Sequence, residues 1–415
     1  MKVAGRLHLD AFLISRCWSR IRPASRRSVE LGRVIVIAPP ASGNIGDEAM
    51  VHAVGQRIGP RMRLVVTGET IRADHPDMDS VHLPDLVYPR RLSAFIRANR
   101  DLARLVEAGD AVAVLGADMM DGGYSPGAAR RRWAIVGQAG RAGHDARVLG
   151  FSWNGRAPRS VKRAARRAAK HHAQLLARDP VSLRRLQRDS ITTATAAADV
   201  VFSRAGMPGE MHTSELDRIA GVAAGASFAI VNASALVARK VDRHVEHYVR
   251  IIECLNARGL HCVLLPHVIR SSGNDLEECE RIARAVGHAG LSIVKEQLDP
   301  ETVRLLARRA DVVVSGRMHL AVMALGELTP AVTIGTQGKV EGLMELIGRP
   351  SLCIAPSESL GDDVIHEVES VLAEPARIRT QLKLNIPDIR RLAERNFLGL
   401  GIADAATMEI QKVGD

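Results

Sequence analysis

The chain has 415 residues, of which 46% are hydrophobic and 25% charged, as in a folded globular protein large enough for two domains. Its five cysteines include no Cys-x-x-Cys pair and no cluster with histidines at metal-binding spacing, so we expect free thiols in a reducing cytoplasm, no metal site and no cofactor. A net charge of +11 favours polyanionic partners, and because no run of 18 apolar residues occurs, we expect no membrane-spanning helix.

Residues 1–30 are basic but lack the apolar core and the small-residue cleavage site of a signal peptide. We therefore expect a basic N-terminal extension without a fold of its own. A short interfacial helix over residues 7–18, with arginines beyond it, is the alternative.

From residue 33, short apolar strands alternate with helical patterns as far as residue 202. The strands lie in the runs RVIVIAPP, MRLVVTG, AVAVLGAD, ARVLGFSW and AQLLARD, with a last run at ADVVF, and the expected helices cover 47–58, 90–108, 128–143 and 158–172. Continuous apolar strands separated by helices are typical of a parallel sheet covered on both faces. Residues 31–202 are therefore predicted to form an N-terminal Rossmann-like domain.

Two glycine turns follow strands of this domain. The first is Gly43-Asn44-Ile45-Gly46-Asp47-Glu48, which lacks both the GxGxxG spacing and the lysine of a P-loop; the second runs from Gly116 to Gly123. The carboxylates of Asp47 and Glu48 would repel a phosphate, and those of the second turn can accept hydrogen bonds from sugar hydroxyls or act as a base. We therefore expect the turns to bind a hydroxylated acceptor through Asn44, Gly46, Asp47, Glu48, Asp118 and Asp121. Helix capping is the alternative for the acids of the first turn.

The helix expected over 158–172 carries six basic residues on one stripe, at positions Arg159, Lys162, Arg163, Arg166, Arg167 and Lys170. A solvated face is one interpretation, and a contact surface for an anionic membrane or a lipid diphosphate is the other. Nucleic acid is not expected as a partner, because no aromatic residues interleave with these charges.

Residues 203–226 contain Gly, Pro and Ser without strand character and are predicted to be a linker. The alternation then restarts, with strands in FAIVNAS, HCVLLPH, LSIVKE, DVVVSG and AVTIG. Residues 227–372 are therefore predicted to form a second Rossmann-like domain, followed by a helical tail over 373–415. The fold class is α/β, with two doubly wound domains facing a cleft and ligands at the carboxyl ends of the strands.

The segment Ser315-Gly316-Arg317-Met318-His319 joins a buried strand to a helix. Gly316 permits a tight turn and close approach of a ligand, while Arg317 and His319 fall in the first helical turn, at the positive end of the helix dipole. A guanidinium there suits a carboxylate or phosphate, and an imidazole can act as a general acid. We predict an anion-binding site; the alternative is an arginine paired with a structural carboxylate, beside a core histidine.

Three further cations at strand ends are candidates for binding the same anion. Lys339 opens the helix after Gly335-Thr336-Gln337-Gly338, His267 ends the run LLPH, and Arg178 closes an earlier strand. For Lys339 the alternative is a solvated lysine at a helix start, and for His267 a structural histidine.

The sequence resembles the polysaccharide pyruvyl transferase family over residues 33–350. The resemblance rests on the turn at 43–48, on Ala177-Arg178-Asp179 followed by Ser182 and Leu183, and above all on SGRMHLAVMALGELTPAVTIGTQGKVEGLMELIG at 315–348. It implies two domains similar to those of a GT-B glycosyltransferase. It also implies that the enolpyruvyl unit of phosphoenolpyruvate is transferred to two saccharide hydroxyls as a ketal, with His319 as the general acid and Arg317, Lys339 and Arg178 binding the donor.

The turn at 116–121 departs from the family, because many members carry a run of glycines there. The expected partners are phosphoenolpyruvate and a short lipid-linked saccharide, in cell-surface or exopolysaccharide assembly at the inner face of the plasma membrane. Two alternatives are a nucleotide-sugar glycosyltransferase of GT-B type and a non-catalytic saccharide- or anion-binding protein.

Overall fold

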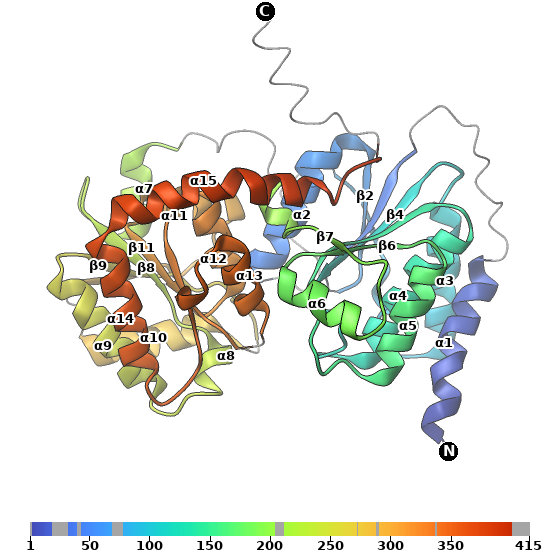
Figure 1. Ribbon diagram of the computed structural model, residues 1–415, viewed down its shortest axis with the longest axis horizontal. Helices are drawn as coiled ribbons and strands as arrows, with labels where there is room; N and C mark the ends of the chain where they lie inside the picture. Colours follow the sequence, from blue (N-terminus) through green and yellow to red (C-terminus); the bar gives the residue numbers. More distant parts are fainter. Residues whose placement is uncertain are drawn as a thin grey trace, which may run out of the picture. The chain divides into compact units, whose positions relative to one another are not determined.

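The computed structural model describes residues 2–18, 32–39, 43–68, 78–203, 211–271, 273–287, 290–336 and 338–400, without the side chains of 2–8. The contacts divide the chain into two units (Figure 1), each of which is described by itself. Unit 1 comprises Met1–Ser42, Met50–Ala205 and Arg391–Asp415, and unit 2 comprises Gly43–Ala49 and Gly206–Arg390.

Unit 1 contains a seven-stranded sheet in the order β3-β2-β1-β4-β5-β6-β7. Every pairing in it is parallel, and the strand order shows that the direction of winding reverses between β1 and β4. The strands are β1 (Val34–Ile37), β2 (Met62–Val66), β3 (Asp79–His82), β4 (Ala111–Ala117), β5 (Asp145–Phe151), β6 (Gln174–Ala177) and β7 (Thr195–Ala196).

Most helices of unit 1 connect these strands, and α1 precedes the first of them. The helices are α1 (Lys2–Trp18), α3 (Leu92–Leu105), α4 (Pro126–Arg141), α5 (Arg159–Lys170) and α6 (Pro180–Arg188), with 3-10 turns at Gly59–Arg61, Pro84–Leu86 and Val200–Phe202. Helix α2 (Ile45–Ile58) begins in unit 2 and continues in unit 1. Three rings of the core, Trp133, Phe151 and Trp153, meet edge to face.

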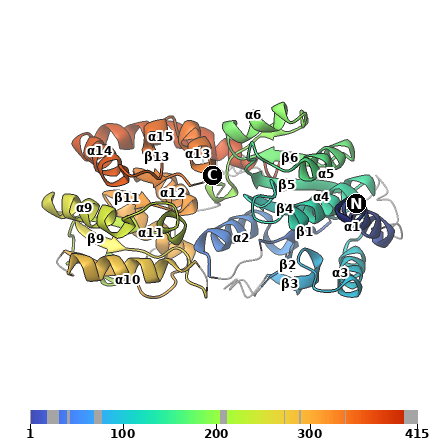
Figure 2. The same cartoon turned by 90° about the horizontal axis from the view of Figure 1, so that it is seen from below.

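The prediction that the N-terminal residues lack a fold is wrong for α1. This helix lies beside α3 and α4 in unit 1 (Figure 2). Ile14 and Trp18, four residues apart and therefore on one helical face, are 0% and 3% exposed. Asp10 also forms an ion pair with Arg131 of α4 at 3.0 Å. The rest of the predicted extension, residues 19–31, lies outside the described residues.

Unit 2 contains a six-stranded sheet in the order β10-β9-β8-β11-β12-β13, again with parallel pairings throughout. Its strands are β8 (Phe228–Asn232), β9 (His261–Leu264), β10 (Leu291–Ile293), β11 (Val312–Ser315), β12 (Ala331–Ile334) and β13 (Cys353–Ile354). Its helices are α7 (Thr213–Ala220), α8 (Ala235–Ala238), α9 (His244–Ala257), α10 (Asp275–Val286), α11 (Pro300–Arg309), α12 (Met318–Gly326), α13 (Lys339–Ile347) and α14 (Leu360–Ala373), with a 3-10 turn at Pro350–Leu352.

The segment predicted to be a linker contains a helix of unit 2. Helix α7 buries Leu216, and its Asp217 forms an ion pair with Arg309 of α11 at 2.8 Å. The tail is helical as α15 (Pro375–Glu394), whose last residues belong to unit 1. Among the described helices, none combines the length and the apolar composition that a bilayer crossing requires.

Candidate functional site

The winding of unit 2 reverses between β8 and β11, the place at which doubly wound sheets bind ligands. At the end of β11 the hydroxyl of Ser315 accepts a hydrogen bond from the amide of Arg317 at 3.0 Å and donates one to its carbonyl at 2.8 Å. A Cβ on Gly316 would stand only 2.5 Å from the Cβ of Ser234. The turn is therefore tight, and only glycine fits at its centre.

Arg317 is the N-cap residue of α12 and has an extended backbone, with φ −125° and ψ 122°. Met318 is the first helical residue, so His319 lies in the first turn, where the unpaired amides and the helix dipole favour an anion. The structure thus places Arg317 and His319 at a helix N-terminus on the carboxyl edge of the sheet.

The guanidinium of Arg317 is held by a carboxylate that sequence reasoning missed. Its Nε donates to Oδ2 of Asp275 at 3.0 Å and its Nη2 donates to Oδ1 at 2.7 Å. Asp275 is fully buried and also accepts from the amides of Ala235 at 3.1 Å and Val268 at 3.1 Å. Two donor nitrogens of Arg317 are therefore committed within the protein, as the alternative of an arginine paired with a structural carboxylate requires, and anion binding by Arg317 stays a prediction.

A sequence signal for Asp275 exists. Asn274 already caps α10 by accepting from the amide of Leu276 at 3.0 Å, so the acid that follows is not needed as a cap. A carboxylate directly after a capped helix start, close to a strand-end histidine, is therefore a candidate partner for a cation.

His267 is 2% exposed, and within the described residues neither nitrogen of its ring has a hydrogen-bond partner. Burial first, and then the positive charges of His319, Arg317 and Lys339, hold the pKa of His267 well below its ordinary value. The imidazole is therefore neutral. Leaving a buried polar group unsatisfied costs about 1–3 kcal/mol, so this ring is suited to a ligand that completes its hydrogen bonding.

Lys339 lies at the start of α13, directly after Gly338 in the left-handed region at φ +73°. The preceding loop carries another cation that sequence reasoning missed, because Lys240 donates a hydrogen bond to the carbonyl of Thr336. We call Arg317, His319, Lys339 and His267 the switch-point cluster, since they follow the ends of β9, β11 and β12 in unit 2.

The turn at 43–48 belongs to this site rather than to the N-terminal domain, where it was expected. The amide of Ile45 donates to the carbonyl of His267 at 3.1 Å, and Asn44 forms an antiparallel bridge with Val268. Ile269 adds a backbone hydrogen bond to the carbonyl of Gly43 at 2.9 Å. These three contacts fasten the turn to the loop after β9, and so Asn44, Gly46, Asp47 and Glu48 lie in unit 2.

Gly46 makes room for the ring of His319. A Cβ at this position would stand 2.4 Å from Nδ1 and 2.8 Å from Cβ of that histidine. The glycine in the motif therefore has a steric reason that involves a residue far along the chain.

The polar residues of the same turn largely organise the start of α2. The side-chain oxygen of Asn44 accepts a hydrogen bond from the amide of Gly46 at 3.1 Å. The backbone carbonyl of Asn44 accepts from the amides of Asp47 and Glu48. Glu48 is 9% exposed and accepts from Nε2 of Gln297 at 2.8 Å. Capping and packing thus account for Asn44 and Glu48, and an acceptor role remains a prediction for this turn.

Arg178 belongs to unit 1, whereas the switch-point cluster belongs to unit 2. It lies in unit 1, is 3% exposed, and donates from Nη1 to Asp199 at 2.7 Å and from Nε to Ser152 at 2.7 Å. Asp179 beside it caps α6 through a 2.6 Å hydrogen bond from the amide of Ser182. A guanidinium taken out of water needs a carboxylate, and Asp199 supplies it within unit 1, so a donor-binding role for Arg178 stays a prediction.

The two acids of the second glycine turn differ in exposure. Asp121 is 7% exposed and accepts from the amide of Gly123 at 2.7 Å, which fixes the turn. Asp118 is half-buried and accepts from the hydroxyl of Tyr124 at 3.0 Å. Ala117 before them has φ +45°, an uncommon conformation for a residue with a side chain. Of the pair, Asp118 is the better placed to meet a ligand.

The switch-point cluster has the chemistry of a site for a small, multiply charged anion. Two helix N-termini, an arginine and a lysine supply positive charge, and a neutral buried histidine supplies a hydrogen bond. His319, at the first turn of α12, is in a position to exchange a proton with a bound anion. No group of three or more metal-binding side chains occurs among the residues that the structure describes.

The family model for polysaccharide pyruvyl transferase matches residues 44–338 of this chain. That range includes residues 44–48 of the turn and three members of the switch-point cluster, His267, Arg317 and His319. Lys339 lies one position beyond its end. A comparison with curated protein sequences found no match.

Among solved structures, the fold resembles a glycosyltransferase from Rickettsia africae, with a TM-score of 0.58, 12% identity, and coverage of 92% of this chain and 99% of that one. It also resembles a UDP-GlcNAc 2-epimerase from Neisseria meningitidis, with a TM-score of 0.57, 12% identity, and coverage of 88% and 97%. These likenesses support a fold of two Rossmann-like units of GT-B type.

Proposed function

The chain belongs to the polysaccharide pyruvyl transferase family, and we propose that it transfers the enolpyruvyl group of phosphoenolpyruvate to hydroxyls of a saccharide. The observation that carries this proposal is the switch-point cluster. It gathers an arginine, a lysine and two histidines at the carboxyl edge of one sheet, and one of those histidines is buried without a hydrogen-bond partner among the described residues.

Phosphoenolpyruvate carries a carboxylate and a phosphate on adjacent atoms, so its site needs separate positive groups. The N-termini of α12 and α13, together with Lys339, suit the two anionic groups. Arg317 contributes through the edge that Asp275 does not occupy, and the same carboxylate holds its guanidinium in one orientation. His267, kept neutral by its surroundings, donates or accepts one hydrogen bond without adding charge.

In the proposed reaction His319 gives a proton to the methylene carbon of phosphoenolpyruvate, which becomes a methyl group. One saccharide hydroxyl then forms a bond to the adjacent carbon, and a second hydroxyl forms the other bond of the ketal as the carbon–oxygen bond to phosphate breaks. Of the two hydroxyl protons released, one returns to His319 and the other leaves with the phosphate. The products are a cyclic ketal and inorganic phosphate.

The acceptor in this proposal is a short lipid-linked saccharide of cell-surface or exopolysaccharide assembly, modified in the cytoplasm. The acidic turn at 116–123 supports a hydroxylated acceptor, because carboxylates accept hydrogen bonds from sugar hydroxyls. Asp118, half-buried at the end of β4, is the residue of that turn proposed to contact it.

A thermal-shift panel with phosphoenolpyruvate, inorganic phosphate and UDP- or GDP-sugars tests the donor. We expect phosphoenolpyruvate at millimolar concentration to raise the melting temperature and nucleotide sugars to leave it unchanged. Stabilisation by nucleotide sugars alone would favour a glycosyltransferase, and no shift with phosphoenolpyruvate would reject the proposed donor.

The variant His319→Ala tests the proton transfer. It should abolish acceptor-dependent phosphate release while the melting temperature of the free protein changes little. His366→Ala, at an exposed position of α14, is the matched control and should keep full activity. Normal turnover by His319→Ala would exclude this residue as the general acid.

A further inference from the structure

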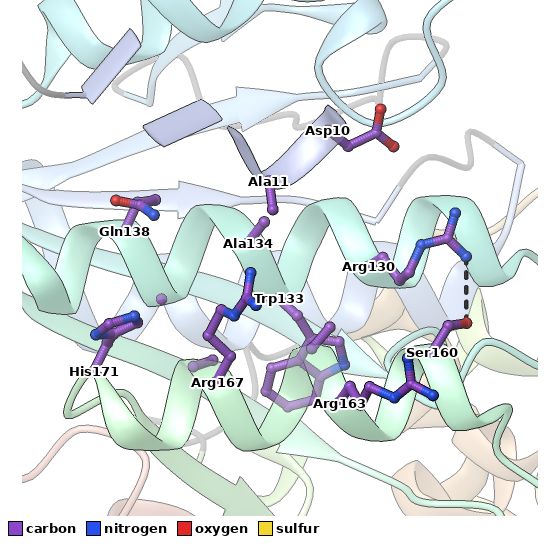
Figure 3. A pocket seen from close by; sticks show the side chains of 13 residues that line it. Asp10, Ala11, Arg130, Trp133, Ala134, Gln138, Ser160, Arg163, Arg167 and His171 are labelled. Carbon is purple, nitrogen blue, oxygen red and sulfur yellow. Dashed lines mark hydrogen bonds between the residues drawn. The ribbon is translucent and has the colours of Figure 1, made fainter. Parts of the chain in front are cut away.

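Unit 1 contains a second concentration of positive charge, which the proposed transfer reaction does not use. A pocket of about 90 Å³ opens between α1, α4 and α5 (Figure 3). Four basic residues line it: Arg130 of α4, Arg163 and Arg167 of α5, and His171, which follows α5. The acidic residue of the lining is Asp10 of α1.

The wall of this pocket between α4 and α5 is apolar and built from small residues. Ala134 and Gly137 come from α4, and Ala164 and Ala168 from α5. A Cβ on Gly137 would be 3.1 Å from the Cα of Ala168, so the two helices pack closely here. The pocket therefore combines an apolar wall with a basic rim, which is the pattern that an amphipathic anion requires.

Four of the six basic residues on the stripe of α5 form two pairs with different surroundings. Lys162 forms an ion pair with Asp189 at 2.5 Å, and Nε of Arg166 donates to the carbonyl of the same residue at 2.9 Å. Arg163 and Arg167 are exposed, lie one turn apart at the pocket, and have no side-chain hydrogen bond or ion pair with any described residue. Arg163 and Arg167 are thus available to a ligand, whereas Lys162 and Arg166 hold α5 against the end of α6.

The cations around the pocket repel one another. Burial and then the neighbouring positive charges of Arg141, Arg167 and His172 lower the pKa of His171. Burial likewise lowers the pKa of Arg130, opposed by Asp10. Figure 3 shows Arg130 reaching from α4 to α5, where its Nη1 donates a hydrogen bond to the hydroxyl of Ser160 at 3.5 Å. A bound anion would relieve this repulsion.

The helix that supplies Asp10 also presents an apolar face to solvent. Leu9 is 41% exposed and Phe12 is 55% exposed, and the guanidinium of Arg16 lies 5.3 Å from the ring centroid of Phe12. Large apolar side chains beside arginines are typical of helices that lie in the interface of a bilayer. A pocket for a dissolved phosphate would not need them.

We propose that the pocket between α1, α4 and α5 binds the phosphate headgroup of an anionic phospholipid, while Leu9 and Phe12 enter the membrane interface. Arg163 and Arg167 contact the phosphate, and the small residues of α4 and α5 accommodate the apolar part next to it. This site is separate from the switch-point cluster and does not depend on which reaction that cluster performs.

Co-sedimentation of the full chain with vesicles tests the proposal. Vesicles of phosphatidylcholine containing phosphatidylglycerol should bind the protein, and vesicles of phosphatidylcholine alone should not. Each basic side chain near an anionic surface contributes a factor of about five, so Arg163→Gln with Arg167→Gln should weaken binding about 30-fold. Arg284→Gln with Arg308→Gln removes the same charge from exposed positions of unit 2 and should have little effect.

Ala164→Leu separates a pocket from a diffuse basic surface, because it fills the pocket without changing the charge. It should weaken binding to phosphatidylglycerol vesicles by a factor of at least about five. Ala134→Leu, from the opposite wall, is the second filling variant if the first lowers the melting temperature. If the folded filling variants bind vesicles as the unaltered chain does, the proposal that the pocket holds the headgroup is wrong. If Arg284→Gln with Arg308→Gln weakens vesicle binding as much as Arg163→Gln with Arg167→Gln, the effect is one of net charge alone.

Glycerol 3-phosphate distinguishes a lipid from a dissolved phosphate. If it displaces the protein from vesicles at millimolar concentration, and Phe12→Ser binds vesicles like the unaltered chain, the site is one for soluble phosphates and the lipid proposal is wrong. We expect the opposite, with little displacement and a clear loss of binding in Phe12→Ser.

Discussion

The contact between Gly46 and His319 gives a sharp prediction for Gly46→Ala. The added methyl group would stand 2.4 Å from Nδ1 and 2.8 Å from Cβ of His319, so the whole histidine side chain or the start of α2 must move. Overpacking of this kind costs about 1–3 kcal/mol. A shift of about 1 Å at a catalytic group lowers turnover about a hundredfold. We therefore expect both a less stable unit 2 and a large loss of activity.

Gly127→Ala is the matched control, because Gly127 occupies the same second position in the first turn of α4. Its added Cβ would meet nothing closer than 3.6 Å, at Nη1 of Arg131, and alanine is the better helix former. The assays are thermal unfolding, in which 1 kcal/mol corresponds to about 2–4 °C for a domain of this size, and acceptor-dependent phosphate release. If Gly46→Ala matches Gly127→Ala in both assays, the proposed steric role of Gly46 is incorrect.

Three further predictions concern buried groups of unit 2. Asp275→Asn removes the charged partner of the largely buried guanidinium of Arg317, so urea denaturation should show that the free energy of unfolding falls by about 3–5 kcal/mol. Phosphoenolpyruvate should also bind more weakly, because Arg317 is no longer oriented. An unchanged midpoint of urea denaturation would argue against the importance of this ion pair. His267→Leu removes a buried ring that has no hydrogen-bond partner among the described residues, so the free protein should become no less stable. The rise in melting temperature that phosphoenolpyruvate induces should become smaller. A destabilised free protein would instead indicate a structural histidine. The pKa of His244 is lowered to about 4 by burial and by the charges of Arg281 and His247. This histidine therefore stays neutral in the folded state above pH 4, whereas the unfolded chain takes up a proton below pH 6.5. Its contribution is therefore present above pH 6.5 and lost between pH 6.5 and 4, at a cost of about 3 kcal/mol, and His244→Phe should make the unfolding free energy less dependent on pH across that window.

Most of the sheet architecture follows from the sequence, because buried parallel strands are continuous apolar runs that few other structures produce. The four residues Val34–Ile37 and the seven residues Ala111–Ala117 are buried throughout, and both were predicted. Three of the edge strands, β3, β7 and β13, were not predicted, whereas the edge strand β10 lies in the predicted run LSIVKE. Strand β3 (Asp79–His82) is largely exposed and polar, so the sequence contains no hydrophobic pattern that would predict its pairing with β2. Conversely, the apolar run at 198–202 forms a 3-10 turn at Val200–Phe202, because Asp199 caps it through the amide of Val201 at 3.0 Å.

The site was predicted less completely, because a sequence shows where a charge lies along the chain but not which group neutralises it. Arg178 and Arg317 both follow buried parallel strands, and the two look equivalent in sequence. Each proves to be paired with an aspartate, Asp199 for Arg178 and Asp275 for Arg317, yet they differ in what surrounds the pair. The side chains of Arg178 and Asp199 are 2% and 3% exposed. The side chain of Arg317 is 12% exposed, and its charge lowers the pKa of a buried histidine that has no hydrogen-bond partner among the described residues. A carboxylate therefore holds each of the two arginines, and the buried histidine beside Arg317, which has no hydrogen-bond partner among the described residues, is the feature that favours a binding site there.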